Sequence, residues 1–247
     1  MRYEELTIEG RNAVLEAFRA GKTIDKLFLQ DGCHDGPVNS IKREAQKQDT
    51  IINYVSKERL AQMSKTGTHQ GVIAYSSACE YAEVSDILDI AEKKGEPPFI
   101  FILDNIEDPH NLGAIIRTAN LSGAHGVIIP KRRAAGLTAA VARASAGAVN
   151  YTPVAKVTNI SNTIEELKKQ GMWFVCADME GELMYRLNLT GPIGLVIGNE
   201  GNGVSRLVKE KCDYIASIPM KGDIDSLNAS VAAGVMAYEI VRQRMNV

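Results

Sequence analysis

Three stretches of the chain place glycine, asparagine, serine and charged residues directly after an apolar run. Residues 193–205 read IGLVIGNEGNGVS, residues 104–119 read DNIEDPHNLGAIIRTA, and residues 215–239 read IASIPMKGDIDSLNASVAAGVMAYE. Each apolar run predicts a strand that ends in a polar loop. Ligands bind at the carboxyl ends of the strands in open α/β sheets. The three stretches therefore predict one shared ligand site.

The last of these stretches predicts a helix with small side chains. Pro219 ends the preceding strand because it has no N–H to donate. Ser226 or Asn228 can cap the free N–H groups of the helix that follows. Four alanines and one glycine between residues 229 and 237 leave its surface nearly bare, so that a backbone or a flat ligand can come close. Taken alone, the stretch is also explained by a capped, well-packed final helix.

Together the three stretches resemble the motifs of the SpoU/TrmH branch of the SPOUT methyltransferases. The family has an asparagine and arginine pair, matched by Asn111 and Arg117, then an Asn/Ala-Glu-Gly loop, matched at Glu200. Its third motif, Ile-Pro-Met followed by Ser-Leu-Asn, is matched at residues 218–228. The resemblance implies that S-adenosylmethionine is the cofactor and that a methyl group is transferred to an RNA ribose 2′-hydroxyl. It also implies a fold that composition does not reveal, a C-terminal trefoil knot around a mostly parallel sheet.

The resemblance implies a set of catalytic residues, and simpler structural roles remain open for them. Arg117 would activate the 2′-hydroxyl, yet arginine is a poor base, so we favour positioning of hydroxyl and phosphate, with a structural ion pair as the alternative. Asn111 either orients this motif or caps its helix. Glu200 would hydrogen-bond Arg117 or the ligand, and Ser226 and Asn228 would form the pocket or only the helix cap.

The cofactor site implied by the resemblance is an apolar slot for adenine. Gly198, Ile218 and Leu227 match family positions, and Met220 and Ala177 are expected neighbours. A glycine at position 198 would let the backbone approach the ligand without a Cβ between them. The sequence has no phosphate-binding P-loop motif. Its four cysteines and four histidines are scattered, so no metal site is expected.

Alternating helix and strand patterns predict two α/β domains joined by an acidic linker. Residues 1–76 resemble the family's small L30e-like domain, which implies RNA contacts from Arg11, Asn12, His69 and Gln70. Residues 77–98 are acidic and end in Pro97 and Pro98, and we interpret them as the linker. Residues 99–247 are the predicted methyltransferase domain.

The charge distribution also favours a nucleic-acid partner. Residues 109–164 contain six basic residues and no acidic one, although the net charge of the chain is −2. The run of Lys131, Arg132 and Arg133 is the densest part and is predicted to bind RNA. An ordinary solvated face is the alternative. The chain has no signal peptide pattern and no apolar run long enough to span a bilayer, so a cytoplasmic protein is expected.

Within the family, the sequence is most similar to members that methylate a guanosine of 23S rRNA. The resemblance further implies a homodimer that packs through the knotted domains. Two alternatives remain at this stage. One is the same chemistry on another rRNA nucleotide or on tRNA, and the other is a catalytically silent member that binds RNA only.

Overall fold

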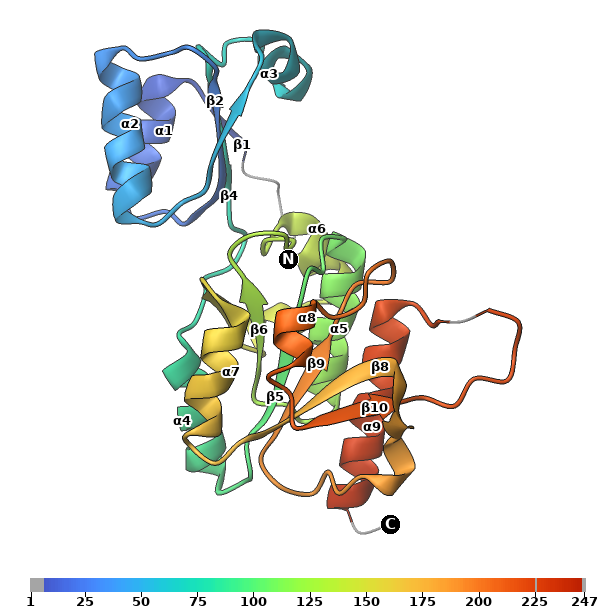
Figure 1. Ribbon diagram of the computed structural model, residues 1–247. Helices are drawn as coiled ribbons and strands as arrows, with labels where there is room; N and C mark the ends of the chain where they lie inside the picture. Colours follow the sequence, from blue (N-terminus) through green and yellow to red (C-terminus); the bar gives the residue numbers. More distant parts are fainter. Residues whose placement is uncertain (1–6, 225, 246–247) are drawn as a thin grey trace. The chain divides into compact units, whose positions relative to one another are not determined.

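The computed structural model describes residues 7–224 and 226–245 (Figure 1). The chain divides into two compact units. Residues 1–80 and 136–140 form the first, and residues 81–135 and 141–247 form the second. Both units are α/β, as the sequence predicts.

The first unit is a four-stranded sheet in the order β1-β4-β2-β3. Strand β4 is antiparallel to both β1 and β2, whereas β2 and β3 are parallel. Helices α1 and α2 bury Phe18 and Ile41 against Leu27 of the sheet. The elements are β1 (Thr7–Glu9), α1 (Arg11–Arg19), β2 (Ile24–Gln30), α2 (Gly36–Lys47), β3 (Ile52–Val55), α3 (Lys57–Met63) and β4 (Val72–Ser76).

The second unit is built on a six-stranded sheet in the order β10-β8-β9-β5-β6-β7. Every strand pair in it is parallel, so all six carboxyl ends lie along one edge. The elements after β4 are α4 (Val84–Lys94), β5 (Phe99–Leu103), α5 (Pro109–Leu121), β6 (Gly126–Pro130), α6 (Ala139–Ala144), the 3-10 helix η1 (Ala148–Asn150), β7 (Val154–Val157), α7 (Ile160–Lys168), β8 (Trp173–Leu183), the 3-10 helix η2 (Met184–Arg186), β9 (Ile193–Ile197), α8 (Arg206–Lys209), β10 (Tyr214–Ser217) and α9 (Ala229–Arg244).

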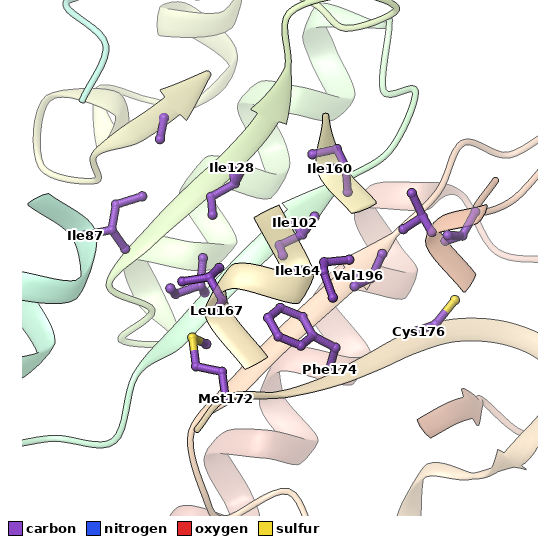
Figure 2. Close-up of a cluster of buried hydrophobic side chains, with 14 residues drawn as sticks. Ile87, Ile102, Ile128, Ile160, Ile164, Leu167, Met172, Phe174, Cys176 and Val196 are labelled. Atoms are coloured by element: carbon purple, nitrogen blue, oxygen red, sulfur yellow. The ribbon is translucent and has the colours of Figure 1, made fainter. Parts of the chain in front are cut away.

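Helices cover both faces of this sheet. On one face, α4, α7 and α8 enclose a buried cluster that includes Ile87, Ile102, Leu167 and Phe174 (Figure 2). On the other face, α5 and α9 pack against each other and against the sheet (Figure 1). The central strand β5 is apolar and completely buried, which is the pattern expected for a parallel strand covered on both faces.

The helix starts decide two capping roles that the sequence left open. Helix α5 begins at Pro109 and is capped by Asp108, whose side chain accepts a hydrogen bond from His110 N. Asn111 is therefore inside the helix and is not its cap. Helix α9 begins at Ala229, and Asn228 is the cap, accepting from the N–H groups of Ser230 and Val231. Asn228 takes the capping role that the sequence left open between it and Ser226.

The predicted linker contains a structured helix. Helix α4 lies within residues 77–98, and its Ile87 and Ala91 are fully or almost fully buried. Ile87 belongs to the core cluster of the second unit. This part of the acidic segment therefore packs into the second unit, and the assignment of residues 77–98 as an interdomain linker stays a prediction. The trefoil knot stays a prediction. In residues 7–224 and 226–245, no helix has the length and apolar character needed to cross a membrane.

Candidate functional site

A pocket of about 370 Å³ lies at the carboxyl edge of the six-stranded sheet. This volume is within the range of small-molecule sites, roughly 300 to 1,000 Å³. Its wall combines small and apolar residues with a few polar and charged ones, which suits a nucleoside with a charged tail. It is lined by Ala177, Asp178, Met179, Glu180, Ile197, Gly198, Asn199, Glu200, Gly201, Asn202, Gly203, Lys209, Ala216, Ile218, Met220, Ser226, Leu227, Ala229 and Ala232.

All five residues predicted to bind the cofactor line this pocket. Ala177 comes from β8, Gly198 from the loop after β9, and Ile218, Met220 and Leu227 from the segment between β10 and α9. The segments meet because β8 lies between β9 and β10 in the sheet. The structure therefore brings the five residues together, and their contact with adenine stays a prediction. Ala229 and Ala232 extend the pocket wall along the first turn of α9.

Gly198 is required for a different reason from the one predicted. A Cβ at this position would lie 2.1 Å from the carbonyl carbon of Gly203 and 2.2 Å from the nitrogen of Val204. Atoms cannot approach this closely, so any larger residue would push the loop apart. Gly198 therefore lets the loop 198–204 fold back on itself, and the expected close approach of a ligand is not needed to explain it.

Three of the five predicted catalytic residues meet at one carboxylate oxygen. Asn111 Nδ2 donates to Oε1 of Glu200 at 2.6 Å, and Asn228 Nδ2 donates to the same oxygen at 2.7 Å. Asn228 Nδ2 also contacts Oδ1 of Asn111 at 3.0 Å, and the N–H of Ala229 lies 3.3 Å from Glu200 Oε1. Helix α5, the loop after β9 and helix α9 are thereby fixed to each other beside the pocket.

Arg117 lies apart from this cluster. It is exposed on α5, and within residues 7–224 and 226–245 its side chain makes no hydrogen bond or ion pair. The expectation that Glu200 would hydrogen-bond Arg117 is therefore wrong for this structure, because the carboxylate is bound by the two asparagines. The structural ion pair considered for Arg117 is also absent among these residues. Ser226, the fifth catalytic candidate, is exposed and lines the pocket.

The four residues predicted to contact RNA in the first unit lie around a second recess. Arg11, Asn12, His69 and Gln70 line it. Arg11 is held by two contacts, since its Nε donates to the carbonyl of Gln70 at 3.0 Å and its terminal nitrogen lies 2.7 Å from Asp35 Oδ2. The recess thus presents a fixed guanidinium next to amide and imidazole groups.

Glu9 anchors the loop that leads into this recess. Its carboxylate accepts hydrogen bonds from the hydroxyls of Ser64 at 2.5 Å and Thr66 at 2.6 Å, and from the N–H of Lys65 at 2.6 Å. Burial alone would raise the pKa of Glu9, but these hydrogen bonds outweigh it and lower the pKa to about 2. Sequence reasoning missed Glu9, because nothing in the pattern TIEG links it to residues 64–66.

The basic run lies in the loop after β6, at the same edge of the second unit's sheet as the pocket loops. Arg132 and Arg133 are exposed, and Lys131 is partly buried. Arg133 has a positive φ of 56°, which turns the chain sharply at this point. Two exposed guanidinium groups are therefore available on the edge where the site lies.

Comparisons with known proteins agree with this geometry. Residues 98–238 match the SpoU rRNA Methylase family, and residues 7–82 match the family described as RNA 2′-O ribose methyltransferase substrate binding. The chain belongs to the SpoU/TrmH family of RNA methyltransferases. A TrmH family tRNA/rRNA methyltransferase of Bacillus subtilis, YacO, is 50% identical over 237 residues, which cover 95% of this chain and 94% of that protein.

Solved structures of the SpoU/TrmH family share the fold. The SpoU methyltransferase AviRb from Streptomyces viridochromogenes, in complex with AdoMet, is 25% identical and has a TM-score of 0.62 over 98% of this chain and 92% of AviRb. A TrmH/SpoU tRNA modifying enzyme of A. aeolicus is 31% identical with a TM-score of 0.56, over 61% of this chain and 77% of that one. The predicted α/β methyltransferase fold with an N-terminal substrate-binding domain is confirmed.

The pocket also contains charged residues that sequence reasoning missed. Asp178 and Glu180 come from β8, and Lys209 comes from α8. A partial signal for Asp178 was present, since a charged residue directly follows the apolar run FVCA, although β8 continues beyond it to Leu183. The sequence gives no comparable signal for Lys209, which lies in an ordinary helical turn.

Proposed function

We propose that this protein transfers a methyl group from S-adenosylmethionine to the 2′-hydroxyl of a ribose in RNA, and that a guanosine of 23S rRNA is its substrate. The observation that carries the proposal is the junction of Asn111, Glu200 and Asn228 next to the 370 Å³ pocket. It places the polar groups of all three motifs beside a slot suited to a nucleoside. AviRb, which shares the fold, was solved with AdoMet.

The pocket residues would bind and orient the cofactor. Ile218 and Leu227 offer apolar contacts to the adenine, and the small side chains of Ala177, Ala229 and Ala232 leave room for a flat ring. When bound, S-adenosylmethionine supplies an electrophilic methyl group on a positively charged sulfur. The walls hold that ligand in one orientation, which matters because reaction requires the attacking and leaving atoms to be in line.

The remaining residues would act on the RNA. In the transfer, the ribose 2′-oxygen would form a bond to the methyl carbon as the carbon–sulfur bond breaks, S-adenosylhomocysteine would leave with the electron pair of that bond, and the 2′-hydroxyl proton would pass to water. Arg117 has a guanidinium without a protein partner among the described residues, so it is free to bind the phosphate next to the target ribose and position the hydroxyl. We assign Arg117 this positioning role. We do not propose that Arg117 removes the proton of the 2′-hydroxyl.

We also propose that two copies pair through α5 and α9. Val231, Val235 and Tyr238 are spaced by four and three residues on α9, and they are 49%, 36% and 51% exposed. Leu121, at the end of the neighbouring α5, is 64% exposed. A second copy of this chain would cover the apolar stripe that these four residues form. Arg117 lies one turn before Leu121 on the same face of α5. The predicted cytoplasmic location stays a prediction.

The proposed reaction is tested by methyl transfer from labelled S-adenosylmethionine into protein-free 23S rRNA and bulk tRNA, followed by mapping of the modified position. Label on one guanosine of 23S rRNA is the expected result. Label in tRNA alone would keep the chemistry and overturn the substrate. If neither RNA is labelled although S-adenosylmethionine binds, the protein is a silent RNA-binding member and the proposed activity is wrong.

A further inference from the structure

Two charged side chains of the pocket have no part in the mechanism described above. Lys209 Nζ lies 2.9 Å from Asp178 Oδ2 and 3.6 Å from Glu180 Oε2. The side chains of Lys209 and Asp178 are only 25% and 19% exposed. Both residues line the pocket. Its wall therefore contains a mostly buried ion pair, whose groups have given up much of their contact with water.

Asp178 has acceptor capacity that the protein does not fill. Its Oδ1 accepts the N–H of Glu180 at 3.0 Å, and its Oδ2 faces Lys209. A carboxylate offers about four lone-pair sites, so about two remain for other donors. Burial would raise the pKa of Asp178, but the N–H of Glu180 and the ammonium of Lys209 outweigh it and lower the pKa below its usual value. Asp178 is thus an ionised acceptor at neutral pH.

The position of Asp178 in the sheet relates it to the glycine loop. Cys176 of β8 lies opposite Val196 of β9. Asp178 follows Cys176 by two residues, where β8 shifts its register against β10, and it lines the pocket together with Gly198 of the loop after β9. In doubly wound folds, a carboxylate next to a glycine-rich turn characteristically accepts a hydrogen bond from the ribose of an adenosine cofactor.

We propose that Asp178 accepts hydrogen bonds from the ribose hydroxyls of the cofactor's adenosine, and that Lys209 is a positioning residue that holds Asp178 at the pocket wall. The proposal rests on the proposed function, since it names a subsite of the same pocket. Its rival is a purely structural pair that ties α8 to β8. The ribose contact and the structural pair predict different binding results. Only the ribose contact makes the effect of replacing Asp178 on affinity depend on the ribose hydroxyls of the ligand.

The test measures binding of S-adenosylhomocysteine and its 2′-deoxy and 3′-deoxy analogues by titration calorimetry. A hydrogen bond to a charged group contributes about 1.5 to 3 kcal/mol, so the native protein should prefer the parent ligand to at least one analogue by about ten- to hundredfold. Asp178→Ala should lose most of this preference and bind the parent ligand correspondingly more weakly. Asp178→Asn, which keeps the shape but not the charge, should retain part of it.

Lys209 and a control pair complete the design. Lys209→Met should weaken binding of the parent ligand, and Lys209→Arg should restore it. Lys211→Met removes a comparable ion pair, with Glu165, whose residues are not in the pocket wall, and it should leave all three affinities unchanged. Thermal melts of each variant establish that it is folded.

Two results would overturn the assignment in different ways. If Asp178→Ala and Asp178→Asn keep the full preference for the ribose hydroxyls, Asp178 does not contact the ribose and the pair is structural, while the proposed function stands. If the native protein does not bind S-adenosylhomocysteine at all, the proposed function fails and the ribose subsite fails with it.

Discussion

Asn228 caps the last helix and donates its Nδ2 to Oε1 of Glu200 at 2.7 Å, across 28 residues of sequence. One side chain thus has two tasks, since its Oδ1 accepts the free N–H groups of α9 while its Nδ2 binds the carboxylate. Of the two roles that the sequence left open for Asn228, the helix cap is confirmed, and its role in the site stays a prediction that the contact with Glu200 supports. The same oxygen of Glu200 binds Asn111 of α5.

Glu200→Ala should lower the rate of methyl transfer more than the loss of unfolding free energy alone would explain. Removal of the carboxylate leaves the buried amide of Asn111 without its acceptor, which costs about 1 to 3 kcal/mol of unfolding free energy. Displacement of the loops should lower methyl transfer by about hundredfold or more. Glu200→Gln, which keeps an acceptor oxygen, is the control and should retain more of both. Stability comes from urea unfolding and activity from label transfer. Full activity in Glu200→Ala would contradict the proposed junction.

Arg117→Ala should separate cofactor binding from catalysis. Arg117 does not line the pocket, so the affinity for S-adenosylmethionine should stay unchanged. Turnover should fall by about hundredfold or more, because the substrate loses a positioning contact. Arg117→Lys keeps the charge without the planar fork and should be intermediate. Arg19→Ala, at an exposed arginine of α1, is the matched control. Unchanged turnover in Arg117→Ala would remove Arg117 from the mechanism.

Replacing Lys131, Arg132 and Arg133 together by alanine should weaken RNA binding without changing cofactor binding. Each phosphate contact contributes about 0.7 to the slope of log affinity against log salt for single strands, so the slope should fall by up to about 2. Fluorescence anisotropy at several salt concentrations measures it. An unaltered slope would mean that the run is only a solvated face.

Glu9→Gln should destabilise the protein in a pH-dependent way. The pKa of Glu9 is lowered from 4.5 to about 2 in the folded state, so its ionised form stabilises the fold above about pH 4.5, and this contribution is lost as the pH falls toward about 2. The urea midpoints of the native protein and the variant should therefore differ most near neutral pH and converge in acid. A difference independent of pH would contradict the assigned pKa.

Val235→Glu should convert the proposed dimer to a monomer. It places a charge in the apolar stripe of α9 that a second copy would cover, and burying an unpaired charge is costly. Light scattering after size exclusion should give the 26.9 kDa of one chain for the variant and twice that for the native protein. Leu207→Glu, at an exposed position of α8, is the control and should stay dimeric. A monomeric native protein would end the proposal.

The sequence predicts local structure well and the side-chain junction poorly. The apolar runs FIFIL and IGLVI form strands β5 and β9, because a short apolar run between polar loops favours a buried strand. The pocket residues were predicted from the family resemblance, and the fold brings them together because the carboxyl ends of parallel strands share an edge. The hydrogen-bond partner of Glu200 could not be predicted from the sequence. Asn111 and Arg117 lie on the same helix, and only the packing of α5 against α9 decides which of the two side chains reaches the carboxylate.

The same limit applies to charges that pair across the fold. Asp178 and Lys209 are 31 residues apart, and their contact depends on how α8 is placed over the end of β8. A helical turn such as RLVK has no pattern that marks one lysine as part of a pocket. Gly198 is similar, since its need for a bare Cα arises from the backbone at Gly203, which only the folded loop brings near.

The position of α9 has a consequence for the order in which the protein acquires activity. Ala229 and Ala232 form part of the pocket wall, and Asn228 completes the junction at Glu200. A growing chain that has made every strand of the sheet still has neither an intact wall nor a complete set of polar groups. In the proposed site, the cofactor can therefore be held only after α9 has docked, so cofactor binding would report that this unit has folded.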